Sequence, residues 1–108
     1  MKRLLLIAAL IAIPALALTA ADAKATYEKE CAKCHGTDGK GETKMGKKVG
    51  CKDYTTAKVQ AEVTDEKAFK AIKEGYKDKD GKQQMKPAEG LSDADIKALV
   101  AYMRTFKK

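Results

Sequence analysis

Cys31-Ala32-Lys33-Cys34-His35 is the stretch of this 108-residue chain that most constrains its fold. Two residues separate its cysteines, and a histidine follows the second one directly. On a helix this spacing places the two thiols about one turn apart, next to the imidazole. The chain holds one further cysteine, Cys51, and no other histidine.

A Cys-x-x-Cys-His motif is typical of covalent haem attachment, because two thiols can add to the two vinyl groups of haem while the histidine ligates the iron. Cys31 and Cys34 are therefore predicted to hold one haem c, with His35 as the proximal ligand. A thioredoxin-like redox pair would need a βαβ pattern. A Cys31–Cys34 disulfide leaves His35 without a role. A zinc site would need Cys51 as well, at a spacing unlike that of a zinc finger.

The sixth iron ligand cannot be a second histidine from this chain, so it is a methionine or a lysine, or the position is open. Met45 lies too close to His35 in sequence to reach the opposite haem face, and Met103 lies on the apolar side of a predicted helix. Met85 precedes Pro87 in a predicted loop and is expected to be the distal ligand. His/Met ligation raises the reduction potential. It also leaves no vacant iron position, which favours electron transfer over catalysis.

The N-terminus has the three regions of a secretory signal: a basic start, an apolar run from Leu4 to Leu18, and the small-x-small pattern Ala21-Asp22-Ala23. Residues 1–23 are therefore predicted to be a cleavable signal peptide and residues 24–108 a single exported domain, most simply periplasmic. The apolar run is shorter than the roughly 20 residues of a membrane span. An uncleaved membrane anchor is the alternative.

The remaining chain is predicted to be all-α, with three main helices and two long loops. One helix runs from Ala25 to Cys34, and a second begins at Thr64 or Asp65 and ends near Gly75. The last helix starts after Ser92, where Asp95 completes a capping-box-like pair.

Large apolar residues are few outside the signal, so the core is predicted to be thin and to need a bound macrocycle for completion. Tyr54 to Val63 is a weaker helix candidate. Glycines argue for loops at 36–50, and again at 77–90. The expected core consists of Tyr27, Val59, Val63, Phe69, Ile72, Leu91, Ile96, Leu99, Val100, Met103 and Phe106.

Taken together, these segments resemble the class I c-type cytochromes, in particular the small bacterial monohaem type. The resemblance covers most of residues 24–108: Tyr27 four residues before Cys31, the C-A-K-C-H-G block, the M-K-P sequence at Met85, and L-S-D-A-D-I-K-A-L-V-A-Y-M-R near the end. It implies a small helical bundle around one covalent haem. The first and last helices would cross, with Tyr27 near Leu99 and Tyr102. The implied activity is electron shuttling between larger redox proteins, without enzymatic catalysis.

One position departs from the family. Many members have a proline in the first loop whose carbonyl accepts the N–H of the axial histidine. This chain has Gly50-Cys51 there. The Cys51 carbonyl is expected to take over that bond, and its thiol is either a small buried group or an exposed one that forms an intermolecular disulfide.

The chain has a net charge of +7, and lysines are frequent in both predicted loops. Bordering a haem, they would steer encounter with acidic surfaces of redox partners, at a rate that falls with salt; general solubility is the alternative. Interleaved charges on an exported, monomeric protein argue against nucleic-acid binding. Two other functions remain open: a five-coordinate haem enzyme or gas-binding protein, and a membrane-anchored haem subunit of a respiratory complex. The loop lysines are Lys40, Lys44, Lys47, Lys48, Lys52, Lys77, Lys79, Lys82 and Lys86.

Overall fold

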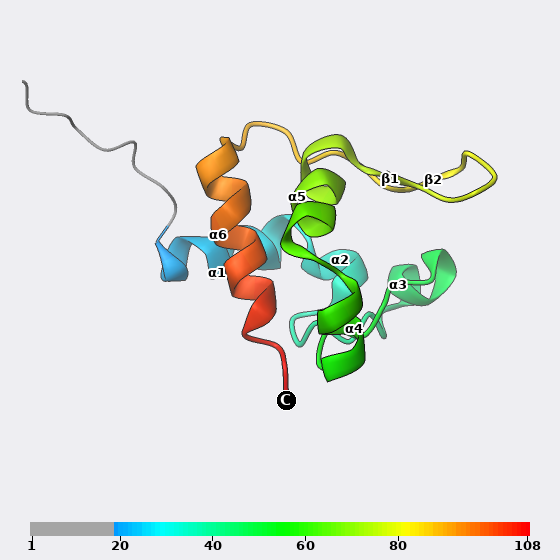
Figure 1. Ribbon diagram of the computed structural model, residues 1–108, viewed down its shortest axis with the longest axis horizontal. Helices are drawn as coiled ribbons and strands as arrows, with labels where there is room; N and C mark the ends of the chain where they lie inside the picture. The colour runs from blue at the N-terminus through cyan, green and yellow to red at the C-terminus, as the bar shows by residue number, and fades with distance from the viewer. Residues whose placement is uncertain (1–18) are drawn as a thin grey trace, which may run out of the picture.

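The computed structural model describes residues 19–108, so residues 1–18 of the expected signal lie outside the described part. Helices make up 54% of the described chain and strands very little of it (Figure 1), which confirms the predicted all-α class. In chain order the elements are α1 (Ala20–Glu30), α2 (Ala32–His35), α3 (Lys44–Val49), α4 (Ala57–Glu62), α5 (Asp65–Glu74), β1 (Tyr76–Lys77), β2 (Gln83–Met85) and α6 (Asp93–Arg104). None of the helices in residues 19–108 is long and apolar enough to cross a bilayer.

Both predicted loops contain short regular elements, which corrects the sequence-based assignment. In the first loop, the Thr43 hydroxyl accepts the Gly46 N–H at 2.8 Å and starts α3, which Gly50 ends in the left-handed conformation. In the second loop, β1 and β2 pair in antiparallel fashion, with Tyr76 opposite Met85. Glycine density therefore marked helix ends and turns rather than the absence of structure.

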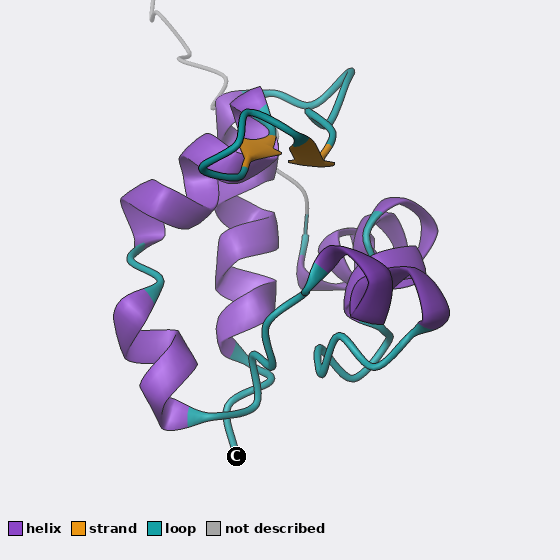
Figure 2. Cartoon of the chain, turned by 90° about the vertical axis from the view of Figure 1, so that its right-hand side faces the viewer, coloured by secondary structure: helices purple, strands orange, loops and turns teal. Residues whose placement is uncertain are grey.

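The first and last helices cross and pack, as the family resemblance implies (Figures 1 and 2). Ala23 and Tyr27 of α1 form one buried cluster with Leu99 of α6. The Tyr27 ring lies 5.2 Å from that of Tyr102 and 5.1 Å from that of Phe106, measured between centroids. Tilted aromatic pairs at this separation each contribute roughly 0.5–1.5 kcal/mol beyond the area they bury.

A second cluster joins α5 to α6 through Ala68, Val100 and Met103. Both helices begin where the sequence predicts. The Thr64 hydroxyl accepts the Lys67 N–H to cap α5, and Ser92 caps α6 in a complete capping box with Asp95. The core is as thin as expected: several predicted members are only half-buried, namely Val59, Val63, Phe69, Ile72, Leu91 and Phe106.

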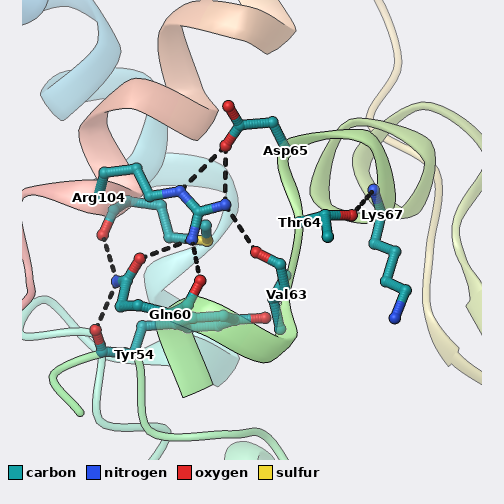
Figure 3. A network of polar contacts seen from close by, with 8 residues as sticks. Tyr54, Gln60, Val63, Thr64, Asp65, Lys67 and Arg104 are labelled. Atoms are coloured by element: carbon teal, nitrogen blue, oxygen red, sulfur yellow. Dashed lines mark hydrogen bonds and ion pairs between the residues drawn. The ribbon is translucent and has the colours of Figure 1, made fainter. Parts of the chain in front are cut away.

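A polar network fastens α4 and the start of α5 to the end of α6 (Figure 3). The guanidinium of Arg104 donates to the main-chain and side-chain oxygens of Gln60, at 2.7 and 2.8 Å. It also donates to the Val63 carbonyl at 2.6 Å and to the Asp65 carboxylate at 2.7 Å. One arginine thus holds three parts of the chain in place.

Gln60 is the buried centre of this network. Its amide nitrogen donates to the Tyr54 carbonyl at 2.6 Å and to the Met103 carbonyl at 3.1 Å. Its side-chain oxygen accepts from Arg104 at 2.8 Å, so the burial of the amide is compensated by hydrogen bonds at both ends. The network therefore also fixes the backbone of Tyr54, which faces the functional region.

Candidate functional site

The Cys-x-x-Cys-His motif lies where α1 gives way to α2. The chain breaks its helix at Cys31, which ends α1 and precedes α2 with a φ of −116°. The single helix predicted for Ala25 to Cys34 is therefore two helices. The Cys31 carbonyl accepts the N–H of His35 at 3.1 Å and the N–H of Cys34 at 3.3 Å. Both cysteines are free thiols, and these main-chain bonds place them and His35 on one turn.

Hydrogen bonds from neighbouring segments hold this turn. The buried Tyr27 hydroxyl donates to the Gly36 carbonyl at 2.6 Å, directly after the motif. The Thr43 hydroxyl donates to the Cys34 carbonyl at 2.7 Å. Burial raises the pKa of Tyr27, so its hydroxyl stays protonated and able to donate over the whole physiological range. The motif is thus braced by α1 on one side and by the start of α3 on the other.

His35 carries a buried ring nitrogen, Nδ1, without a hydrogen-bond partner; no other buried side-chain N or O atom of residues 19–108 lacks one. The Cys51 carbonyl was expected to accept from this nitrogen, and that expectation is wrong in this structure. Burial lowers the pKa of His35 and favours the neutral imidazole, which is the form that ligates metals. The Tyr54 ring covers the imidazole, 5.7 Å away between centroids.

Cys51 is half-buried against the loop that follows the motif. The Cys51 side chain packs closely against the backbone of Gly41, which has a φ of +67°. A Cβ atom added to Gly41 would lie 2.8 Å from the Cβ of Cys51. Burial, followed by the nearby Cys34, raises the pKa of the Cys51 thiol. The Cys51 side chain is thus neither fully buried nor fully exposed, so its burial does not decide between a small core group and a thiol that forms an intermolecular disulfide. Within residues 19–108, no three His, Cys, Asp or Glu side chains form a metal-binding group.

Met85 ends the short strand β2 and is half-buried. The strand passes close to Gly75, where an added Cβ would lie 2.6 Å from the Met85 carbonyl oxygen. Shortly after it, the Ala88 N–H donates to the Ile72 carbonyl at 2.8 Å and fastens the chain to α5. The Met85 segment is therefore a hairpin arm attached to α5 at its base.

The tip of the same hairpin is held by Asp78. Its carboxylate accepts the N–H groups of Asp80 and Lys82 at 2.9 and 3.0 Å, and the Gln84 amide at 2.8 Å. These bonds, that of Gln84 first, lower the pKa of the Asp78 carboxyl. The hairpin thus holds its shape mainly through contacts within itself.

The other two methionines of the described chain lie elsewhere. Met103 is buried in the α5–α6 core, as its place on the apolar side of α6 predicts. Met45 lies on α3 with 37% of its surface exposed. All the lysines of the two predicted loops are exposed except the half-buried Lys40, so positive charge flanks both the motif and the hairpin.

These features define an all-α protein whose crossed terminal helices support a thiol–thiol–imidazole site of the type that holds haem. A family model described as Cytochrome c matches residues 20–107. The chain belongs to the cytochrome c family, of the small class I type.

Curated relatives and solved structures agree with this assignment. Cytochrome c-555 of Chlorobaculum tepidum is 38% identical over 100 residues, which cover 89% of this chain and 84% of the relative. Cytochrome c-555 of Chlorobaculum thiosulfatiphilum is 38% identical over 88 residues, or 78% of this chain and 92% of the relative. The solved KustC0563 c-type cytochrome superposes with a TM-score of 0.68 at 33% identity, covering 80% of this chain and 98% of that one. A solved mutant of Kustc0563 gives a TM-score of 0.66 at 32% identity, with 80% and 99% covered.

Membership of this family means that the chain carries covalently bound haem c and acts as an electron carrier. The structure fits such a group on two observations. Cys31 and Cys34 are free thiols on one turn. His35 is half-buried, burial lowers its pKa, and its buried Nδ1 has no hydrogen-bond partner among residues 19–108.

Proposed function

We propose that the chain is an exported, soluble electron carrier in which Cys31 and Cys34 hold the haem, His35 is the proximal ligand and Met85 is the distal ligand. The observation that carries the proposal is the braced motif turn. Tyr27 and Thr43 fix the main chain on both sides of it, and the half-buried His35 ring lies beside the Tyr54 ring. A rigid turn of this kind presents two thiols and one imidazole in a fixed arrangement.

The two cysteines would attach the group by thioether bonds. Each S–H would add across a vinyl C=C bond, with a carbon–sulfur bond formed and the thiol hydrogen moved to the neighbouring carbon, so that no oxidant would be needed. Burial raises the pKa of Cys31 to about 11, so the free thiol is protonated before attachment. Once bound, the haem supplies a one-electron Fe(III)/Fe(II) couple.

Three observations favour Met85 as the distal ligand. Met103 is committed to the core. Met45 is exposed on α3, only ten positions after His35. Met85 is half-buried on an arm that is fastened to α5 but otherwise free of the helical core. If His35 and Met85 both ligate the iron, no coordination position would be left for a substrate, which would suit a carrier rather than an enzyme.

The sequence and the surface support a periplasmic location and docking on acidic partners. The basic start and apolar run of residues 1–18 are those of an export signal. Exposed lysines beside the motif and on the hairpin would meet acidic surfaces of larger redox proteins. The carrier would work as a monomer, and its electron-transfer rate would fall as salt screens these charges.

Absorption spectra of the purified oxidised and reduced holoprotein, with and without carbon monoxide, test the proposal. We expect a low-spin spectrum with a methionine-to-iron charge-transfer band and little carbon monoxide binding. A high-spin iron that binds carbon monoxide readily would favour the five-coordinate enzyme or gas-binding protein instead.

A further inference from the structure

Ala23 lies in the core of the folded protein, although the sequence pattern places it at the end of the export signal. Its side chain is 1% exposed and packs with Tyr27 and Leu99 between α1 and α6. Cleavage directly after Ala23 would remove this side chain from the crossing of the two helices. A residue with this burial belongs to the mature domain.

The backbone before Ala23 is also part of the fold. The Thr19 hydroxyl accepts the Asp22 N–H at 3.2 Å and donates to the Asp22 carboxylate at 2.9 Å. The Thr19 carbonyl accepts the Ala23 N–H at 2.8 Å. Thr19 is therefore a complete N-cap, and α1 begins four residues before the expected cleavage point. The family model likewise matches from residue 20.

The charges point the same way. Asp22 lies in the first turn of α1, where a negative charge stabilises the positive end of the helix dipole. A chain that began at Lys24 would lose this carboxylate. It would also place a new α-ammonium group next to the Lys24 side chain at the same helix end, which is unfavourable.

We propose that export processing cuts between Ala17 and Leu18, so that the mature protein begins at Leu18 and retains Thr19 and all of α1. Ala15-Leu16-Ala17 supplies the required small-x-small pattern. Water adds across the peptide bond and leaves a carboxylate on Ala17 and an ammonium group on Leu18. Ala21-Asp22-Ala23, which matches the same pattern, lies instead inside the first turns of a packed helix. The inference rests on the proposed export with a cleavable signal.

N-terminal sequencing and intact-mass measurement of the exported holoprotein test the inference directly. We expect Leu18 at the N-terminus. A mature chain that starts at Ala20, Asp22 or Lys24 would overturn the proposal, because each lacks the Thr19 cap. A chain that retains Met1 would overturn the cleavable signal itself, so the two failures are distinguishable.

Two matched variants locate the recognition pattern. Ala21 is exposed, so Ala21→Lys disables the Ala21-Asp22-Ala23 pattern without disturbing the core, and processing should be unchanged. Ala17→Leu should abolish the Leu18 N-terminus. If Ala21→Lys blocks processing while Ala17→Leu does not, the proposal is wrong.

A stability measurement checks the structural reason. Holoproteins that begin at Leu18 and at Lys24 can both be exported behind an unrelated signal peptide. Loss of the cap and of Ala23 should lower the melting temperature of the shorter form by about 5–10 °C. Equal melting temperatures would show that residues 18–23 do not contribute to the fold, which would contradict the inference.

Discussion

The motif turn and the Met85 hairpin are held in different ways. The turn at Cys31 to His35 is braced by residues from two other helical segments, Tyr27 and Thr43, through short hydrogen bonds to its main chain. The hairpin is held by its own Asp78 turn and by attachment at its base to α5. One region is built into the framework, and the other extends from it (Figure 1).

This difference separates the two tasks of the proposed carrier. Covalent attachment uses the region whose geometry is fixed by the helices. Axial ligation by Met85 needs only one bond to the iron, which can form after the haem is attached to the motif turn. The hairpin, which is attached to α5 at its base, can supply that bond. Changes in the turn should therefore affect haem retention and stability, whereas changes in the hairpin should affect the properties of the iron.

The largest effect is expected from Cys31→Ala combined with Cys34→Ala. Both thioether bonds are then impossible, so essentially no haem should stay with the polypeptide after denaturation. Haem absorbance of the denatured chain and its intact mass report the result. Cys51→Ala is the matched control and should retain a full complement; loss of haem in this control would assign Cys51 to the attachment site.

Met85→Ala should lower the reduction potential while leaving the haem attached. Ligation of the iron by a methionine sulfur raises the reduction potential. Because the choice of axial ligand changes haem reduction potentials over a range of about 0.8 V, we expect a drop on the order of 0.1 V in a potentiometric titration. Met45→Ala, on exposed α3, should leave the potential within error of that of the wild type. A larger change in the reduction potential for Met45→Ala than for Met85→Ala would show that the wrong methionine is assigned as the ligand.

Arg104→Ala tests the framework behind the turn. It removes hydrogen bonds to the oxygens of Gln60 and Val63 and to the Asp65 carboxylate, so the free energy of unfolding should fall by about 3 kcal/mol in a denaturant titration. Lys73→Ala breaks an exposed ion pair with Asp93 and a contact with the Phe69 ring, and should cost less than about 1 kcal/mol. Equal losses would show that the Arg104 network contributes no more than a surface pair.

Tyr27→Phe should destabilise the protein moderately, by about 1 kcal/mol, because it removes the shorter of the two hydrogen bonds to the buried Gly36 carbonyl and leaves only that from the Gly39 N–H. The ring contacts with Tyr102 and Phe106 remain. Denaturant unfolding of the holoprotein measures the change. A negligible change in the free energy of unfolding would show that the hydrogen bond from Tyr27 to Gly36 does not stabilise the motif turn.

Gln84→Ala should have the smallest effect. It removes one side-chain bond from the hairpin tip, so the melting temperature should change by no more than about 2 °C. The Asp78 pKa, held down first by this bond, should rise toward its ordinary value in an NMR titration. A large loss of stability here would contradict the view that the hairpin is independent of the core.

The sequence predicted the features that depend on local pattern. The Ser92–Asp95 capping box, the Thr64 cap and the motif turn are all determined by residues within a few positions of one another. Helix α3 was missed because Gly46 and Gly50 were interpreted as loop residues, whereas Gly50 is a left-handed helix end. The β strands, of two and three residues, are too short for alternation to register.

Long-range contacts were beyond the reach of the sequence pattern. Gln60 is a buried polar residue whose partners, Met103 and Arg104, lie more than 40 positions away. Ala23 was assigned to the signal because its neighbours match a cleavage pattern, and only its packing against Leu99 shows that it belongs to the core. The unpartnered Nδ1 of His35 likewise depends on the folded arrangement around it.

The most direct test of His35/Met85 ligation is an NMR spectrum of the reduced holoprotein labelled with carbon-13 at the methionine methyl groups. We predict one methyl resonance shifted far upfield by the haem ring current, absent from Met85→Leu and retained in Met45→Leu. A spectrum without such a resonance, or one in which it persists in Met85→Leu, would contradict the assignment of Met85 as the distal ligand.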